Sequence, residues 1–181
     1  TQGDQTRYKP YSIYSHPDDP TITFCVKLVH GGFASTYFAD APLGDEVRMR
    51  GPLGQFTLDD DLDHHILLAT GTGVAPMHSI IKEALQSDQN AVELFHGIPT
   101  QDDLIDETTF QELDNTHGGF SYTPVFSRED SGHEGYVQDH APIQDNTAYY
   151  LCGLKAFVEE TTSYLTENQV SEALINRERF S

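Results

Sequence analysis

The sequence predicts an all-β N-terminal region followed by an α/β domain built on a doubly wound parallel sheet. Residues 8–58 contain a β-rich apolar stretch at 22–29 and an alternating stretch at 46–50, separated by glycine and proline turns. From residue 64 onward, apolar strand-like runs alternate with helical patterns, which favours a parallel sheet with helices on both faces. The acidic run 59–63 separates the two patterns. We therefore expect domains at 1–60 and 61–181.

Each element of the second domain has its own local signal. Strands are expected at 66–69, 91–96, 120–126 and 148–152, and helices at 76–85, 102–113 and near 155–168. The helix at 76–85 carries Met77, Ile80, Ile81 and Leu85 on one side, as an amphipathic helix requires. In the N-terminal region, one short helix is expected to start at Ser35.

Composition excludes several classes of protein. The 181 residues carry 10 Lys and Arg against 29 Asp and Glu, a net charge of −19, which disfavours nucleic acid and anionic membranes as partners. This charge suits a salt-rich environment or an ordinary acidic surface. No apolar run approaches the roughly 18 residues that a membrane span needs. With no signal-peptide pattern and with Cys25 and Cys152 in apolar runs, we expect reduced thiols and a cytoplasmic protein.

The most informative motif joins the first strand of the second domain to its first helix. Thr70-Gly71-Thr72-Gly73 follows a buried strand, and Pro76 is suited to a first helical turn. Such a turn directs free backbone N–H groups and the positive end of a helix dipole at one point, which favours a phosphate. A plain strand–helix connection is the alternative interpretation of this turn alone.

Four more motifs accompany this turn in a fixed order, and together the five resemble the ferredoxin–NADP reductase superfamily. They are Lys9-Pro10-Tyr11-Ser12, Gly32-Phe33-Ala34-Ser35, Gly51-Pro52-Leu53-Gly54-Gln55-Phe56, and Tyr150-Leu151-Cys152-Gly153 with Glu178 and Phe180 following it. The resemblance implies a Greek-key flavin-binding β-barrel followed by a nucleotide-binding α/β domain. Only eight residues precede Lys9, so the barrel is expected to be N-terminally incomplete.

The resemblance assigns the first two motifs to FAD. Tyr11 would pack on the flavin ring, Ser12 would lie near flavin N5, and Lys9, with Pro10 beside it, would face the FAD phosphate. The family has arginine where Lys9 stands, and lysine keeps the charge but loses the bidentate fork. Gly32, Phe33, Ala34 and Ser35 would hold the pyrophosphate, with Ser35 capping the short helix and donating to phosphate oxygen.

The later motifs are assigned to the nicotinamide cofactor. Thr70, Gly71, Thr72 and Gly73 would receive the dinucleotide. Cys152 and Gly153 would lie where nicotinamide stacks on flavin, and Glu178 and Phe180 would return to the flavin edge. Leu154 stands where the family has proline. Among all these residues, Ser12, Cys152 and Glu178 are the catalytic candidates.

The choice between NADPH and NADH depends on one arginine. Ser127-Arg128 resembles a pair that holds the 2′-phosphate in relatives that use NADPH, and an arginine fork favours a phosphate. The adjacent Glu129, and Tyr136 in place of a second basic residue, argue against it. We expect NADPH with NADH as the alternative. The nine histidines show no metal-ligand spacing, so no metal is expected and they are interpreted as surface residues.

These motifs together predict a FAD-dependent NAD(P)H oxidoreductase. It would pass a hydride from nicotinamide to flavin and then electrons to a ferredoxin, a flavodoxin or an oxygenase component. A non-catalytic flavin- or nucleotide-binding subunit of a larger redox assembly is the alternative. A Rossmann-like NAD module without flavin is a weaker one, because Tyr11-Ser12 and 32–35 are intact.

Overall fold

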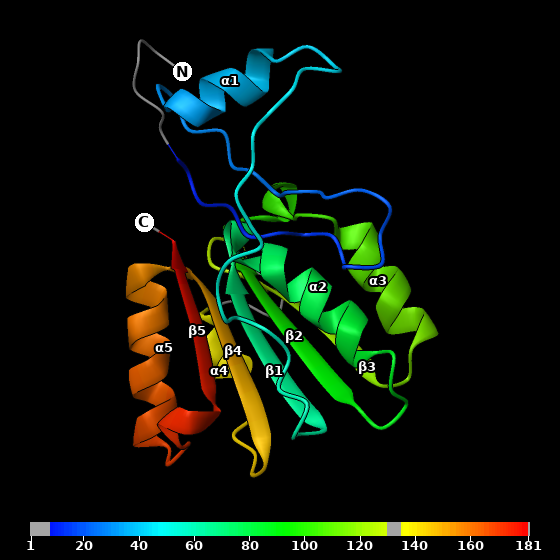
Figure 1. Cartoon of the computed structure of the whole chain (residues 1–181). Coiled ribbons are helices and arrows are strands. Elements are labelled where there is room, and N and C mark those ends of the chain that lie inside the picture. Colours follow the sequence, from blue (N-terminus) through cyan, green and yellow to red (C-terminus); the bar gives the residue numbers. More distant parts are fainter. Residues whose placement is uncertain (1–7, 130–134, 181) are drawn as a thin grey trace.

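A five-stranded parallel sheet forms the centre of the molecule (Figure 1). The computed structural model describes residues 8–129 and 135–180. The strands are β1 (His64–Thr70), β2 (Ala91–Ile98), β3 (Phe120–Phe126), β4 (Thr147–Leu154) and β5 (Ile175–Phe180). Their order across the sheet is β3-β2-β1-β4-β5, and every neighbouring pair is parallel. The doubly wound sheet predicted from the sequence is therefore present.

The position of each strand in the sheet follows from its side chains. β1 and β4 are central, and nearly all of their residues are buried, as expected for strands covered on both faces. β3 and β5 are the edges. Pro124 in β3 lacks a donor, which an edge strand tolerates. In β5 only Ile175 is buried. The four residues that follow it are polar or charged, so the sequence has no apolar run here and predicted no strand.

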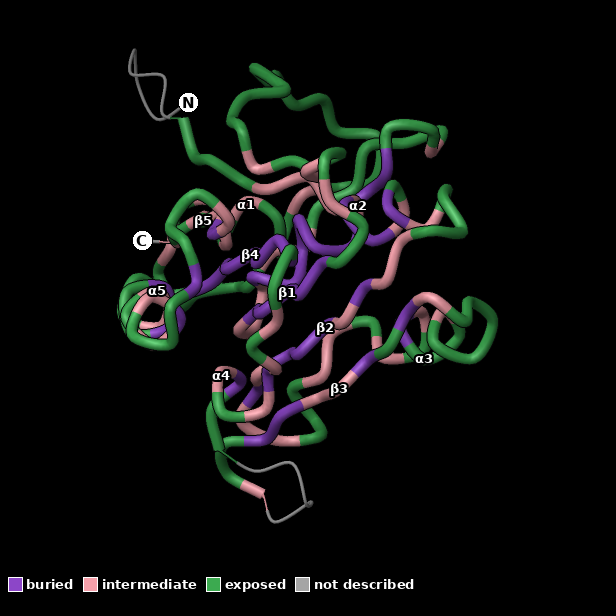
Figure 2. The backbone as a smooth tube through the Cα atoms, turned by 90° about the horizontal axis from the view of Figure 1, so that it is seen from below, coloured by how far each residue is buried: buried purple, intermediate pink, exposed green. Residues whose placement is uncertain are grey.

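Helices cover both faces of the sheet. The helices α2 (Val74–Ala84) and α3 (Glu107–Thr116) pack into one apolar cluster with β1, β2 and β4. The helices α4 (Val137–His140) and α5 (Lys155–Glu167) pack into a second cluster on the opposite face. Figure 2 shows the buried residues concentrated in the strands and in α2.

Two of the expected helices differ from the prediction at their starts. The helix expected from Pro76 begins at Val74 and is preceded by a 3₁₀ turn, η1 (Gly71–Gly73). The helix expected at 102–113 is divided into a 3₁₀ turn, η2 (Gln101–Asp103), and α3. The division falls where Asp106 takes a left-handed backbone conformation with φ of 52°. A further 3₁₀ turn, η3 (Glu172–Leu174), leads into β5.

The N-terminal region has little regular structure in the part of it that is described. It contains the helix α1 (Phe33–Asp40), which begins two residues before the expected Ser35, and one isolated bridge between Ile13 and Phe24. The strands expected at 22–29 and 46–50 are not formed, and several of their apolar side chains are exposed. A strand needs a partner for its backbone groups, and residues 8–58 pair only through that bridge.

The N-terminal region nevertheless has fixed contacts with the sheet. The helix α1 lies beyond the end of the sheet at which β5 finishes (Figure 1). Residues 14–19 instead contact α2 and the start of α3. The Phe56 ring packs edge-on against Tyr150 of β4 with centroids 5.8 Å apart. The Tyr150 hydroxyl accepts a hydrogen bond of 2.8 Å from the Asp59 N–H. The described helices include none with the length and apolar character of a membrane span.

Candidate functional site

Several of the predicted site residues lie at the carboxyl edge of the sheet, where the strand order reverses, whereas Gly32–Ser35 lie at the start of α1, away from the sheet. From β1 the chain adds β2 and β3 on one side, and it then returns to place β4 on the other side of β1. In open α/β sheets, ligands bind beyond the carboxyl ends of the strands at this point of reversal. The glycine turn after β1 and the Cys152–Gly153 pair near the end of β4 both lie there.

The glycine turn joins β1 to α2 without a break. Thr70 is extended, Gly71 has a positive φ of 51°, and η1 continues directly into α2. A positive φ is inexpensive only for glycine, so Gly71 allows the sharp change of direction. No side chain caps η1 or α2, so their first N–H groups remain open to a ligand. This arrangement fits a phosphate.

Two glycines let this turn approach β4 closely. A Cβ atom on Gly73 would lie 2.1 Å from the carbonyl oxygen of Cys152, and one on Gly153 would lie 2.1 Å from Thr70 Oγ1. Gly73 requires glycine because the atoms that a Cβ would meet belong to the backbone of β4. At Gly153 the Thr70 side chain would have to move, and the φ of 157° also disfavours other residues. Thr70 Oγ1 is buried and has no hydrogen-bond partner within the described part of the chain. The turn therefore has uncapped backbone N–H groups beside a buried hydroxyl that lacks a partner.

The buried His96 of β2 contacts the glycine turn, a role that the sequence did not predict. His96 of β2 has no exposed surface, and its Nε2 lies 3.0 Å from the carbonyl oxygen of Gly71. A carbonyl accepts, so Nε2 carries the proton. Burial lowers the pKa of His96 to about 4, which keeps the ring neutral at pH 7. His96 thus holds Gly71 through a neutral hydrogen bond.

The three catalytic candidates are close to one another. Cys152 and Glu178 are register partners on β4 and β5, and the Ser12 hydroxyl donates a hydrogen bond to the Glu178 carboxylate. Cys152 is fully buried, and its thiol pKa is raised first by burial and then by the charge of Glu178. Such a thiol stays protonated, so it can act by shape and position but not as a thiolate. Phe180 ends β5 and packs against the apolar cluster that contains α2.

An aromatic group surrounds the motif assigned to flavin. Tyr11 is 37% exposed, and its ring packs edge-on against Phe24 and Phe38 with centroids 6.5 Å and 5.7 Å away. Lys9 and Pro10 are exposed beside it. An accessible aromatic face next to a cation fits a flat ring that carries a phosphate tail.

The second motif assigned to FAD surrounds the start of α1. Gly32 is the N-cap of this helix, and Phe33, Ala34 and Ser35 form its first turn. Ser35 does not cap the helix as expected, because its Oγ accepts a 2.8 Å hydrogen bond from the Val29 N–H. The hydroxyl is thus committed to the loop as an acceptor, and it keeps its own proton for donation.

The residues assigned to the 2′-phosphate lie at the end of β3. Backbone N–H groups of Ser127 and Arg128 donate to the carbonyls of Ile98 and Pro99, each over 3.0 Å. Both residues are exposed. The neighbouring Glu129 carboxylate accepts a 3.0 Å hydrogen bond from the Gln101 N–H, which draws this carboxylate into the loop after β2.

The interpretation of the histidines as surface residues was wrong for four of them. His16, His65, His78 and His96 are all buried. These histidines pack between structural elements. The sequence showed only that they are polar residues and could not predict that they are buried. Within residues 8–129 and 135–180, no cluster of His, Cys, Asp or Glu could hold a metal ion. Cys25 and Cys152 are free.

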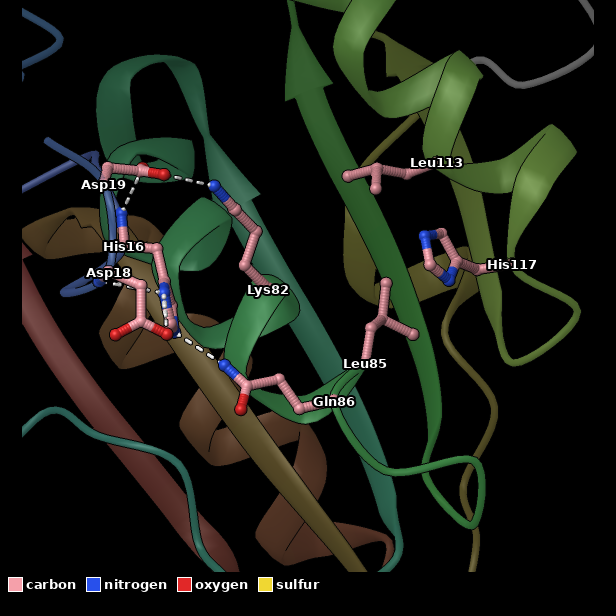
Figure 3. Close-up of a pocket in the computed structure, with 8 residues that line it drawn as sticks. All are labelled: His16, Asp18, Asp19, Lys82, Leu85, Gln86, Leu113 and His117. Atoms are coloured by element: carbon pink, nitrogen blue, oxygen red, sulfur yellow. Dashed lines mark hydrogen bonds and ion pairs between the residues drawn. The ribbon is translucent and has the colours of Figure 1, made fainter.

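Two surface hollows are lined by residues outside the predicted site. One of about 320 Å³ lies between residues 16–19, α2 and α3, where His16 and Asp19 contact α2 (Figure 3). The other, of about 490 Å³, lies between α5 and β5 and includes Arg177 and Arg179. Neither contains a predicted site residue, so the candidate site is the open carboxyl edge of the sheet.

The fold and this edge define a nucleotide-binding oxidoreductase module, and family models agree. An oxidoreductase NAD-binding domain model matches residues 67–163, and an oxidoreductase FAD-binding domain model matches residues 1–58. The chain belongs to the ferredoxin–NADP reductase superfamily, with its FAD-binding and NAD-binding domains in the usual order.

Several curated proteins and solved structures are similar to the chain. It is 33% identical to the reductase subunit of an aromatic O-demethylase from Amycolatopsis, over 96% of this chain and 56% of that protein. It is 31% identical to the electron transfer component of toluate 1,2-dioxygenase from Pseudomonas putida, over 98% and 55%. A crystal structure of an Amycolatopsis cytochrome P450 reductase matches with a TM-score of 0.82 at 31% identity, over 94% and 55%.

A further structure supports the fold alone. It is the flavohem-like FAD/NAD-binding domain of nitric oxide dioxygenase from Vibrio cholerae, with a TM-score of 0.86 at 21% identity, over 99% of this chain and 80% of that one. The chain spans about half the length of the curated relatives described above.

Proposed function

We propose that this chain is the FAD- and NAD(P)H-binding part of a reductase that supplies electrons to a ferredoxin, a flavodoxin or an oxygenase component. Its relatives are named as reductase or electron transfer components of demethylase and dioxygenase systems. One structural observation carries the proposal. Ser12 from the flavin motif meets Glu178 beside Cys152 at the edge that also bears the glycine turn. Residues assigned to two cofactors thereby share one site.

Residues 8–58 would contribute part of a flavin-binding barrel in this proposal. Lys9 would attract the FAD phosphate, and Tyr11 would cover one face of the flavin ring. The first turn of α1 at Gly32–Ser35 would hold the pyrophosphate through backbone N–H groups and the Ser35 hydroxyl. The exposed aromatic side chains Tyr11, Phe24 and Phe38 support this assignment, because a bound flavin would remove them from water.

The nucleotide domain would hold the nicotinamide cofactor over the flavin. The open N–H groups at the glycine turn would bind the pyrophosphate, and Cys152–Gly153 would leave room for the nicotinamide ring. When bound, the flavin would supply the hydride and single-electron redox chemistry. The protein would contribute positioning, since holding the two reacting atoms about 3–3.5 Å apart accounts for much of the rate acceleration.

Ser12 and Glu178 would orient the flavin ring. Ser12 gives its hydroxyl proton to Glu178, which leaves the Oγ lone pairs available to accept a hydrogen bond from a ring N–H. Cys152, protonated and buried, would present a small neutral surface to the nicotinamide. Exposed Arg128 would bind the 2′-phosphate of NADPH, and NADH is the alternative donor.

An anaerobic titration tests the proposal. The chain is incubated with FAD, freed of excess flavin, and titrated with NADPH and separately with NADH while the yellow flavin absorbance is followed. Retained flavin that bleaches on titration supports the reductase, and the donor effective at lower concentration identifies the cofactor. Retained nucleotide without bleaching would instead favour a non-catalytic binding subunit. Absence of flavin binding would overturn the assignment of residues 8–58.

A further inference from the structure

The segment that carries Ser12 is extended and presents alternate residues to opposite sides. The bridge from Ile13 to Phe24 sets the extended backbone, and in such a segment residues two apart share a side. Tyr11 faces the aromatic group formed with Phe24 and Phe38. Ser12 and Tyr14 face the nucleotide domain, where Ser12 meets Glu178. The position of Tyr14 therefore determines the position of Ser12.

His78 of α2 holds Tyr14 in two ways. Its ring stacks on the Tyr14 ring with centroids 4.1 Å apart and planes 6° from parallel. Its Nδ1 lies 2.9 Å from the Tyr14 carbonyl oxygen, so Nδ1 carries the proton and donates. Only 7% of His78 is exposed, and Phe110 of α3 packs on its other side with centroids 6.1 Å away. The histidine is therefore fixed between the segment and the helices.

Tyr14 is also fixed at its other end. Its hydroxyl donates a hydrogen bond to the carboxylate of Asp106, the N-cap residue of α3, and its N–H donates to the Thr23 carbonyl over 2.9 Å. Two helices of the nucleotide domain thus hold a single residue of the flavin segment. Farther along the segment, His16 and Asp19 contact Glu83 and Lys82 of α2, each over 2.7 Å, but these pairs are partly exposed.

We propose that His78 is a positioning residue that fixes the flavin-motif segment on the nucleotide domain, and so sets Ser12 against Glu178. The inference rests on the proposed function for its catalytic consequence only. His78 lies on the helix that begins at the glycine turn. One rigid helix therefore carries the dinucleotide turn at its start and the anchor of the flavin segment one turn later.

This placement matters because hydride transfer is sensitive to small displacements. A shift of about 1 Å between two reacting groups can lower a rate by about 100-fold. Without His78, Tyr14 keeps its bond to Asp106 but loses its ring partner and the donor to its carbonyl. The segment could then slide over α2 while the sheet and the glycine turn remain intact.

Hydrogen exchange of the cofactor-free chain tests the placement directly. Variants His78→Leu and His78→Phe are compared with the original chain by mass spectrometry. We expect His78→Leu to raise exchange at residues 11–16 about tenfold or more, because a stacking contact and a hydrogen bond are lost. His78→Phe, which keeps the ring, should restore part of the protection. Exchange in β1 and β4 should not change in either variant.

The exposed His64→Leu at the start of β1 is the matched control and should leave exchange at residues 11–16 unchanged. Tyr14→Leu removes the other partner of the stacking contact. It should also raise exchange at residues 11–16, and it tests the inference if His78→Leu does not fold. Unchanged exchange at 11–16 in folded His78→Leu and Tyr14→Leu would overturn the inference, as would a loss of protection spread evenly over the sheet.

A second measurement uses the chain loaded with FAD. We expect His78→Leu to slow anaerobic flavin reduction at saturating NAD(P)H about tenfold or more, while the Kd of the nicotinamide cofactor stays within about twofold. Equal loss of rate and nucleotide affinity would count against a positioning role. If the unaltered chain is not reduced at all, the proposed function fails. The exchange experiment still decides whether His78 places the segment.

Discussion

The Ser12 hydroxyl donates a hydrogen bond to the carboxylate of Glu178, and this contact joins residues 166 positions apart. It connects the flavin motif to β5, the edge strand beside β4. Glu178 is also the register partner of Cys152 and contributes, after burial, to the raised pKa of that thiol. A single carboxylate thus links the three residues expected to lie near the reacting rings.

A double-mutant cycle measures this contact. Ser12→Ala, Glu178→Ala and the double variant are unfolded with urea. We expect a coupling free energy of about 1 kcal/mol, the usual size for a partly buried hydrogen bond. Independent effects of the two changes would show that the contact adds nothing to stability.

Gly73→Ala is expected to destabilise the fold by about 2–3 kcal/mol, because the new Cβ would lie 2.1 Å from the Cys152 carbonyl oxygen and backbone cannot yield easily. Gly118→Ala is the matched control, since its Cβ would meet nothing within 4 Å. The free energy of unfolding in urea compares the two. Similar values for both variants would refute the close packing of the turn on β4.

Arg128→Ala tests the assignment of the 2′-phosphate. We expect the Kd of NADPH to rise about tenfold and the Kd of NADH to stay within about twofold, because a guanidinium hydrogen-bonds a phosphate but has no such role with a free hydroxyl. Isothermal calorimetry measures both. Lys155→Ala, at an exposed cation on α5, controls for the loss of one charge. Equal changes for NADPH and NADH would remove Arg128 from the site.

Buried His96 predicts a stability that falls in mild acid. Burial holds its pKa at about 4 in the fold against 6.5 in the unfolded chain. As the pH falls below 6.5, the unfolded chain takes up the proton first. The contribution of His96 is therefore complete above pH 6.5, and about 3 kcal/mol is lost by pH 4.

Urea unfolding between pH 5 and 7 measures this slope, and we expect His96→Gln to flatten it. His117→Gln, at an exposed position, should leave it unchanged. An identical slope in His96→Gln and the original chain would mean that His96 does not stay neutral in the fold.

The two thiols should differ in reactivity. Cys152 is fully buried and Cys25 is half-buried, and burial is the first cause of the raised pKa of each. We expect iodoacetamide to modify Cys25 in the folded chain well before Cys152, as measured by peptide mass spectrometry. Faster modification of Cys152 would indicate that β4 opens readily or that the thiol is activated.

The sequence predicted best where local pattern and final environment agree. Buried runs such as Leu67–Ala69 form central strands, and the glycine turn follows β1 as expected. β5 was missed because an edge strand with Asn176, Arg177 and Arg179 has no apolar run. The strands expected at 22–29 and 46–50 failed for the opposite reason: β-rich residues form strands only when their backbone groups find partners.

Parts of the candidate site depend on contacts between distant residues. The pattern alone could not bring Ser12 to Glu178, and only the family resemblance suggested that both belong near flavin. Nothing in the local sequence indicated that His78 stacks on Tyr14 or that His96 supports Gly71. Histidine in an apolar helix face or strand has no distinctive spacing, so these roles become visible only in the fold.

The edge position of β5 has a consequence for the order in which the molecule assembles. The strands β1, β2 and β3 pair in sequence order through crossovers of short sequence separation, and β4 pairs with β1 over a longer one. The Ser12–Glu178 contact closes a loop about twice as long as that. Contacts of large separation form late, because their closure entropy must be offset by structure already in place. A nascent chain that has emerged from the ribosome only as far as residue 174 would therefore contain strands β1 to β4, while Ser12 would still lack the Glu178 carboxylate as its partner.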